Sequence, residues 1–178
     1  SESSRWRHLD PRNVVPSTLL NQALHYFELH ESKIRNKNYL TVLDFTQHSS
    51  KKRLYVINLS SGAVEQHLAA HGAGSQGTNT GWIPGVSNSN GSHLSSKGFY
   101  LTAETYNGSH GYSLKLDGLS TTNSAARARA IVIHPADYVR AGMNPIGRSW
   151  GCPALDPSVS AAVINKLKNG SLIYAYYE

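Results

Sequence analysis

Apolar residues recur with a helical period only near the two ends of the chain. Apolar positions three and four apart predict a helix that starts at Pro16 and Ser17 and runs to about residue 34. A second helical pattern covers residues 158–168 and ends at Asn169 and Gly170. Elsewhere, short runs rich in β-branched and aromatic residues predict seven strands, at 39–46, 53–59, 64–70, 99–103, 112–117, 129–134 and 171–177.

Turn-forming residues separate these strands and set the organisation of the chain. Residues 60–62, Ser-Ser-Gly, predict a hairpin turn. Residues 71–98 are so rich in Gly, Ser and Asn that they predict a long loop, a feature that is often functional in compact domains. Residues 1–15 are polar and irregular and are expected to form an arm. The prediction is a mostly β domain at 16–178, a mixed sheet or sandwich with peripheral helices.

Length and charge limit what this domain can be. A chain of 178 residues suits one domain, and no run reaches the roughly 18 apolar residues of a membrane span. The net charge of +6 suits an anionic partner such as a cell-wall polymer, or a merely solvated basic surface. The basic residues are scattered, with the densest group at 51–53, and no basic helix or aromatic RNA-binding motif occurs. Nucleic acid is therefore not an expected partner.

The single cysteine, Cys152, excludes an intramolecular disulfide and any zinc site built from several cysteines. A lone cysteine is most often a small buried apolar residue. In an exported protein, however, an unpaired thiol invites oxidation, so its presence there points to a chemical role. The sequence implies no cofactor and no metal.

Residues 130–155, AIVIHPADYVRAGMNPIGRSWGCPAL, bring a histidine and the cysteine into one segment. The apolar strand before His134 delivers the imidazole to a strand end, where a sheet presents side chains to a cleft. Gly151 permits a tight turn whose backbone N–H groups point at a bound oxygen. An imidazole that takes the proton of Cys152 supplies the reactive thiolate. On the residues alone, acyl transfer competes with a buried cysteine and a hydrogen-bonded structural histidine.

The same segment resembles the motif of L,D-transpeptidases, which is a His, a spacer, a Ser or Thr, and then usually His-Gly-Cys. Fourteen residues separate His134 from Ser149, and the run Ser-Trp-Gly-Cys that ends at Cys152 completes the motif. Upstream, residues 95–102 are similar to the strand that these domains place beside the active site. Residues 106–114 and the run GRSWGCPAL resemble the murein L,D-transpeptidase catalytic-domain subfamily. The resemblance implies an L,D-transpeptidase-type fold.

This resemblance, which spans roughly residues 16–177, also implies a two-step acyl transfer on peptidoglycan stem peptides. Cys152 attacks the carbonyl between an L-centre and a D-residue, and a D-amino acid leaves. An amine of a second stem then resolves the thioester into a 3–3 cross-link. His134 is implied as base and then acid, with its ring oriented by the carbonyl of Pro135. The N–H groups of Gly151 and Cys152 are implied as the oxyanion hole.

Two positions depart from the family's pattern. Trp150 stands where the motif usually has His, and Pro153-Ala154 follow the cysteine where an Arg is usual. We expect Trp150 to shape substrate access, with packing in the core as the alternative. Arg148 is a candidate to contact a substrate carboxylate, with an exposed arginine as the alternative. If water resolves the thioester, the protein is an L,D-carboxypeptidase or endopeptidase instead.

Other polar residues are candidates for the cleft. Ser149, His71 and His110 are expected to line it, while surface histidines are the alternative. His67 and His71 are four apart, but no Glu follows in a zinc-protease pattern, so a metal site is not expected. Asp137 is a weaker candidate for a third catalytic group than for a solvated loop acid.

The resemblance implies a periplasmic or otherwise extracytoplasmic location in a bacterium, although no basic-plus-apolar signal peptide opens the sequence. Peptidoglycan stem peptides are the implied partners, carbapenem-type inhibitors are expected to acylate Cys152, and a monomer is expected. The alternative from another class is a catalytically silent wall-binding module that keeps the fold and uses its basic surface. The presence of both Cys152 and His134 argues against that alternative.

Overall fold

The computed structural model describes residues 4–178, which form one β-sheet with a helix on each side. The helices are α1 (Ser17–Leu29) and α2 (Pro157–Leu167). The strands are β1 (Tyr39–Asp44), β2 (Leu54–Asn58), β3 (Val64–His67), β4 (Gly98–Gly108), β5 (Gly111–Gly118), β6 (Val132–Pro135), β7 (Ala154–Leu155) and β8 (Leu172–Tyr176). The expectation of a mostly β domain with peripheral helices is confirmed.

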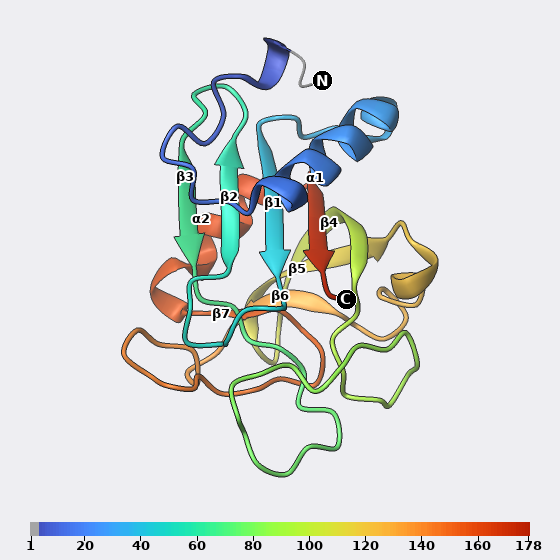
Figure 1. Cartoon of the computed structure of the whole chain (residues 1–178). Coiled ribbons are helices and arrows are strands. Elements are labelled where there is room, and N and C mark those ends of the chain that lie inside the picture. The colour runs from blue at the N-terminus through green and yellow to red at the C-terminus, as the bar shows by residue number, and fades with distance from the viewer. Residues whose placement is uncertain (1–3) are drawn as a thin grey trace.

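The strands form a mixed sheet in the order β3-β2-β1-β8-β4-β5-β6-β7. β1, β2 and β3 pair antiparallel in sequence, as do β4, β5 and β6. β8 follows α2 and lies between the two groups, parallel to β1 and antiparallel to β4. The sheet twists strongly, so that β5, β6 and β7 turn away from the direction of β1 and β2 (Figure 1).

Apolar residues cover both faces of the central strands, which explains why β1 and β2 are almost continuously apolar in sequence. On one face, Phe27 of α1 packs in a core with Leu40 and Ile57. The other core holds Ile164 of α2 together with Ile133 of β6. In Figure 1, α1 crosses in front of β1 and α2 lies behind the sheet. The strand that carries the candidate histidine is therefore anchored in a packed core.

All seven predicted strands are present, and the differences lie at their ends. β4 continues past residue 103 because it shifts register between Thr102 and Thr105 and then resumes pairing with β5. The sequence does not predict β7, since two residues carry no periodic pattern. α1 ends at Leu29 rather than near residue 34, and a 3₁₀ turn, Glu31–Lys33, follows it.

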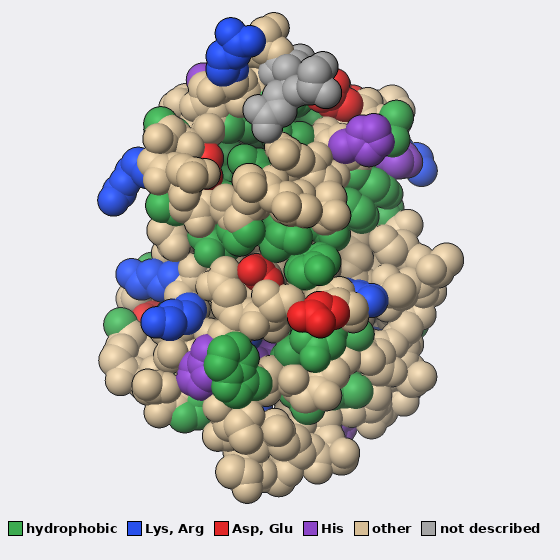
Figure 2. Space-filling view, in the orientation of Figure 1, with side chains coloured by type: hydrophobic (Ala, Val, Ile, Leu, Met, Phe, Trp, Pro, Cys, Tyr) green, Lys and Arg blue, Asp and Glu red, His purple; other side chains and the backbone are tan. Residues whose placement is uncertain are grey.

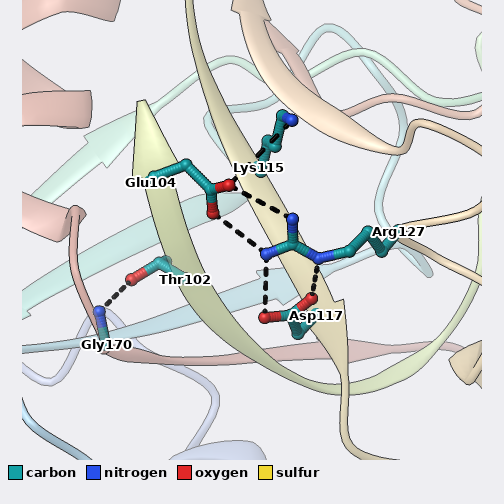
Figure 3. Close-up of polar contacts among 6 residues, drawn as sticks. All are labelled: Thr102, Glu104, Lys115, Asp117, Arg127 and Gly170. Atoms are coloured by element: carbon teal, nitrogen blue, oxygen red, sulfur yellow. Dashed lines mark hydrogen bonds and ion pairs between the residues drawn. The ribbon is translucent and has the colours of Figure 1, made fainter. Parts of the chain in front are cut away.

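Polar contacts fasten β4 to its neighbours (Figure 3). The guanidinium of Arg127 donates to Asp117 of β5 at 2.5 Å and to Glu104 of β4 at 3.0 Å. The backbone N–H of Gly170 donates to Thr102 Oγ1 at 3.0 Å, which ties β4 to the turn before β8. Both contacts hold β4 in place beside the region where the register shifts.

The described residues that precede α1, 4–15, pack on the domain. Trp6, Leu9 and Val15 are buried with the residues of α1. The Trp6 ring meets Phe27 edge-on at 5.5 Å, and its Nε1–H donates to Glu28 at 2.8 Å. This segment therefore extends the core on the α1 side of the sheet.

Basic residues are dispersed over the face shown in Figure 2, where Lys and Arg side chains are separated by polar and apolar ones. Arg53, from the densest basic group in the sequence, is fully buried and adds nothing to the surface charge. Within residues 4–178, neither helix is long and apolar enough to cross a membrane.

Candidate active site

The turn that carries Cys152 is clamped between two distant parts of the chain. Ser149 forms a parallel bridge with Gly72 through two backbone hydrogen bonds, of 3.0 and 2.9 Å, to the residues on either side of Gly72. Just beyond the cysteine, Ala154 enters β7 and pairs with His134 of β6. The thiol therefore lies between the start of the 71–98 loop and the strand that carries the histidine.

Ser149 also shapes this turn with its side chain. Its Oγ donates to the Cys152 carbonyl at 2.6 Å and accepts the Gly151 N–H at 3.1 Å. Gly151 has a φ of +122°, and a Cβ there would lie 2.8 Å from the Leu94 carbonyl oxygen and 2.9 Å from Ile131, so a side chain does not fit. The Gly151 N–H therefore has a partner within the turn, and its part in an oxyanion hole stays a prediction.

The Cys152 sulfur lies against the backbone that leads into β6. It accepts the Val132 N–H at 3.4 Å and donates to the Ala130 carbonyl oxygen at 3.4 Å. Ala130 has a φ of +55°, a left-handed conformation that costs a non-glycine residue about 1 kcal/mol or more. Burial raises the pKa of the Cys152 thiol, while the Val132 N–H and the Arg129 cation oppose that rise. The thiol is therefore protonated near neutral pH.

His134 is buried at the end of β6, and its tautomer follows from one contact. Nδ1 lies 2.7 Å from the Pro135 carbonyl oxygen. Because a carbonyl only accepts, Nδ1 carries the proton and Nε2 is left unprotonated. Burial lowers the pKa of His134, the Pro135 hydrogen bond raises it, and the neighbouring His110 lowers it, with a net decrease. The imidazole is therefore neutral at neutral pH and can accept a proton.

The resting pair is thus a protonated thiol and a neutral imidazole, because both pKa shifts favour the uncharged forms. The sulfur bonds to Val132 N, and His134 lies two residues further along the same strand. Within residues 4–178, none of the hydrogen bonds joins the two side chains directly. That Nε2 comes within about 3 Å of the sulfur during catalysis stays a prediction.

His110 lies beside the catalytic histidine candidate, at the exposed turn between β4 and β5. Its ring stacks on that of His134 with centroids 4.3 Å apart and planes inclined by 20°. A surface groove of about 450 Å³ opens at this point, lined by His110, Pro135, Asp137 and Tyr138 among others. The groove is therefore lined by the residue that stacks on His134 and by the residue whose carbonyl holds its Nδ1–H.

We expect His110→Gln to raise the pKa of His134. The substitution removes a neighbour whose positive form repels the imidazolium and whose ring covers His134. The base form of His134 exists above its folded pKa, so the ascending limb of kcat/KM against pH should move to higher pH. Rates measured between about pH 4 and 8 check this, and an unmoved limb would show that His110 does not tune the base.

His71, expected to line the cleft, is instead fully buried. Its Nδ1 lies 2.9 Å from a guanidinium nitrogen of Arg53, and because a guanidinium only donates, the ring is neutral with its proton on Nε2. Burial and the Arg53 cation lower the pKa of His71 to about 3. Arg53 also donates to the carbonyls of Ala69 and Gln47. The pair fixes the backbone to which Ser149 is bonded, so His71 supports the turn from within the core.

Arg148 and Trp150, the two candidates for substrate contacts near Cys152, differ in how far they are exposed. Arg148 donates to the carbonyls of Gln76 and Gly77 at 2.8 and 3.2 Å, and so anchors the 71–98 loop. These hydrogen bonds to backbone carbonyls account for the position of the Arg148 side chain, and no substrate carboxylate is needed to explain it. Trp150 is 74% exposed and stacks on His93 with centroids 4.3 Å apart and planes inclined by 4°. The indole therefore stands at the surface, two residues from the nucleophile candidate, and not in the core.

The weaker candidates have partners of their own. Asp137 is exposed and forms an ion pair with Arg140 at 3.5 Å, so its carboxylate faces solvent. His67 bonds to Glu65 at 3.0 Å. Across residues 4–178, the His, Cys, Asp and Glu side chains form no group of three that could hold a metal ion.

Residues 12–176 match the family described as L,D-transpeptidase catalytic domain. The chain belongs to this family. The resemblance inferred from the motif around His134 and Cys152 is thereby confirmed. Membership makes the chain a catalytic domain of the L,D-transpeptidase class. A search of curated protein sequences finds no match.

Solved structures, L,D-transpeptidases among them, resemble this chain at low sequence identity. One from Mycobacterium tuberculosis aligns with a TM-score of 0.51 and 13% identity, over 79% of this chain and 58% of its own. A mutant of the helical cell shape determining protein Pgp2 from Campylobacter jejuni gives 0.52 and 13%, over 82% and 49%. LdtMt1 in complex with imipenem gives 0.48 and 13%, over 78% and 59%. The chain thus spans 49% to 59% of the length of these structures, and the first two show the shared fold.

The structure adds residues to the site that the sequence analysis does not single out. Arg53 is grouped there with two surface lysines, although its place at the start of an apolar strand is a signal of burial. Arg129 and Ala130 lie just before β6 and reach the turn of Cys152, but nothing in their spacing indicates this contact. His93, in the long loop, is found only through its stacking on the motif tryptophan.

Proposed function

We propose that this domain catalyses acyl transfer on peptidoglycan stem peptides through a Cys152 thioester and so forms 3–3 cross-links. The observation that carries the proposal is the position of the thiol. It bonds to the backbone of β6 two residues before His134, whose Nδ1–H is held by Pro135. A neutral imidazole with a free Nε2 beside a protonated thiol is the arrangement that activates a cysteine nucleophile. Family membership supports the reaction class.

In the first step, the Cys152 sulfur attacks the carbonyl carbon between the L-centre and the D-residue while Nε2 of His134 takes the thiol proton. The S–C bond forms, the C–N bond to the departing D-residue breaks, and His134 returns its proton to that nitrogen. In the second step, the amine of another stem loses a proton to His134 and attacks the thioester carbonyl, the C–S bond breaks, and His134 returns the proton to the Cys152 thiolate. The Pro135 carbonyl stabilises the transient imidazolium through Nδ1–H.

The backbone N–H of Cys152 is our candidate donor to the oxyanion. Among residues 4–178 no acceptor bonds to it, whereas the Gly151 N–H is bonded to Ser149 Oγ. The rigid turn holds this N–H on the residue that makes the attack, so it need not reorganise as negative charge develops. Ser149 thus acts on the geometry of the turn rather than on the substrate.

The surface beside the site supports two roles in substrate binding. We assign the groove at His110 and Pro135 to binding of the acceptor stem, because His110 stacks on the His134 ring that must take the proton of the acceptor amine. On the other side, the exposed face of Trp150 offers a flat apolar surface backed by His93. We assign Trp150 to substrate access because an indole has one N–H donor and no acceptor, and does not transfer protons near neutral pH.

Trp150→His is therefore expected to change KM or substrate preference by about tenfold, the size of one pocket contact, while acylation of Cys152 still occurs. Stability should change little, because the side chain is 74% exposed. Trp82→His is a matched control, since Trp82 is also exposed and packs on a histidine, His48. The melting temperature and the kinetics toward several stem peptides distinguish a role of Trp150 in substrate access from a role in stability. A lower melting temperature with unchanged kinetics would contradict the access role.

The experiment that tests the proposed function uses purified disaccharide-tetrapeptide and mass spectrometry. A cross-linked dimer with release of the terminal D-residue supports transpeptidation. A tripeptide product instead means that water resolves the thioester, as in an L,D-carboxypeptidase. The groove at His110 is open to solvent, which is the observation that keeps hydrolysis as the second candidate. If the disaccharide-tetrapeptide yields neither the cross-linked dimer nor the tripeptide, both transpeptidation and hydrolysis are contradicted.

A catalytically silent wall-binding module is distinguished by thiol acylation. Carbapenem-type inhibitors should add their acyl group to Cys152 if the site is active, and intact-mass measurement detects the adduct. A silent site should not acylate. Since stem peptides of the cell wall are the proposed substrate, we also propose an extracytoplasmic, periplasmic place of action.

A further inference from the structure

We propose that Arg129 is a positioning residue of the proposed thioester chemistry, whose cation stabilises the Cys152 thiolate and whose guanidinium holds the 87–94 segment against the catalytic turn. The inference rests on Cys152 as the nucleophile. It concerns a residue outside the motif that contains His134 and Cys152.

The guanidinium of Arg129 lies directly behind the catalytic turn. Its Nη2 donates to the Leu94 carbonyl oxygen at 2.8 Å. That same oxygen lies 2.8 Å, and Nη2 3.4 Å, from the position that a Cβ on Gly151 would occupy. The absence of a side chain at Gly151 is what lets the cation approach the residue next to Cys152.

The backbone of the same segment contacts the thiol from the other direction. Ala130, the next residue after Arg129, accepts the hydrogen bond from the Cys152 sulfur at 3.4 Å. Two consecutive residues, Arg129 and Ala130, therefore reach the catalytic turn, one through its guanidinium and the other through its carbonyl.

The charge of Arg129 is not neutralised by its hydrogen bonds. Its three acceptors are the carbonyls of Ser87 and Leu94 and the hydroxyl of Ser92, and all three are uncharged. The side chain is half-buried, where a charge acts more strongly than it does in water. Arg127, two residues earlier, differs in this respect because it is paired with Asp117 and Glu104.

Other groups that face the thiol cannot supply this charge. Tyr100 of β4 and Tyr138 after β6 both interact with Cys152, and burial raises the pKa of each phenol, so both remain neutral. His134 on β6 is neutral because burial lowers its pKa. Arg129 is thus the cation that acts on the thiol from the elements packed around it, and its effect on the pKa of Cys152 is downward.

The experiment measures the rate of Cys152 alkylation by iodoacetamide against pH in the intact protein. Arg129→Gln keeps amide N–H donors and removes the charge. Arg129→Lys keeps the charge but loses the planar guanidinium that donates to several acceptors at once. We expect Arg129→Gln to slow alkylation near pH 7 by about tenfold, with rates that converge with the wild type at high pH. Arg129→Lys should stay close to the wild type, and the matched control Arg127→Gln should leave the profile unchanged.

A purely structural role predicts the reverse order, with Arg129→Lys shifted and Arg129→Gln near the wild type, and would overturn the proposal. So would an unshifted profile in a folded Arg129→Gln protein, or the failure of both variants to fold. Alkylation needs no cell-wall substrate, so a negative result leaves the proposed transpeptidation standing. Failure to process stem peptides, in turn, does not alter the alkylation profile.

Discussion

Replacing Cys152 by alanine is expected to abolish turnover and leave the fold intact. The thiol makes two polar contacts, with Val132 N and Ala130 O, and both backbone groups lie at the partly open site. Loss of the nucleophile should cost on the order of 10³-fold or more in rate. Turnover of a stem-peptide substrate and the melting temperature, measured on the same preparation, check this expectation.

Cys152→Ser is the matched control for this prediction, because it keeps the size of the side chain and its polar contacts. A hydroxyl is a much weaker nucleophile at neutral pH than a thiol, so this variant should also be nearly inactive and should not be alkylated by iodoacetamide. Substantial turnover by a well-folded Cys152→Ala protein would contradict the mechanism.

His134→Gln is expected to lower kcat/KM by about 10² to 10⁴-fold, the range of general acid–base catalysis. The resting thiol is protonated because burial raises the pKa of Cys152, and without Nε2 nothing beside it takes the proton. The ascending limb of the pH–rate profile should also disappear, since His134 is the group that must lose a proton first. The measurement is kcat/KM across the pH range, together with the rate of acylation.

His25→Gln serves as the control for the histidine prediction, because His25 is exposed on α1 and distant from the site in the fold. It should leave both the rate and the pH profile unchanged. If His134→Gln keeps the ascending limb of the wild type, another group is the base and the assignment of His134 falls.

The parts of this fold that follow from sequence are those set by local pattern. The seven strands and both helices have apolar periods long enough to be recognised, and their predicted positions agree with the structure except at their ends. The placement of His134 at a strand end, with Nδ1 on the carbonyl of the next residue, involves neighbours in sequence. Such short-range features require no knowledge of how distant segments meet.

The parts that sequence does not predict depend on long-range contacts. β7 exists because Ala154 meets β6, and the buried His71 bonds to Arg53, which directly precedes β2, the strand that pairs with β3. A local exception is the bond from the Gly151 N–H to Ser149, two residues away, which depends on the rotamer of Ser149 and which no spacing rule indicates. The charge of Arg129 matters only because a tertiary contact brings it behind Gly151.

The central position of β8 determines when the sheet of this domain can be completed. The β1–β3 and β4–β7 groups are joined edge to edge only through β8, which is synthesised after every other strand. A nascent chain that lacks residues 172–176 therefore cannot close the sheet, and the frame behind Cys152 stays incomplete until translation has passed this strand.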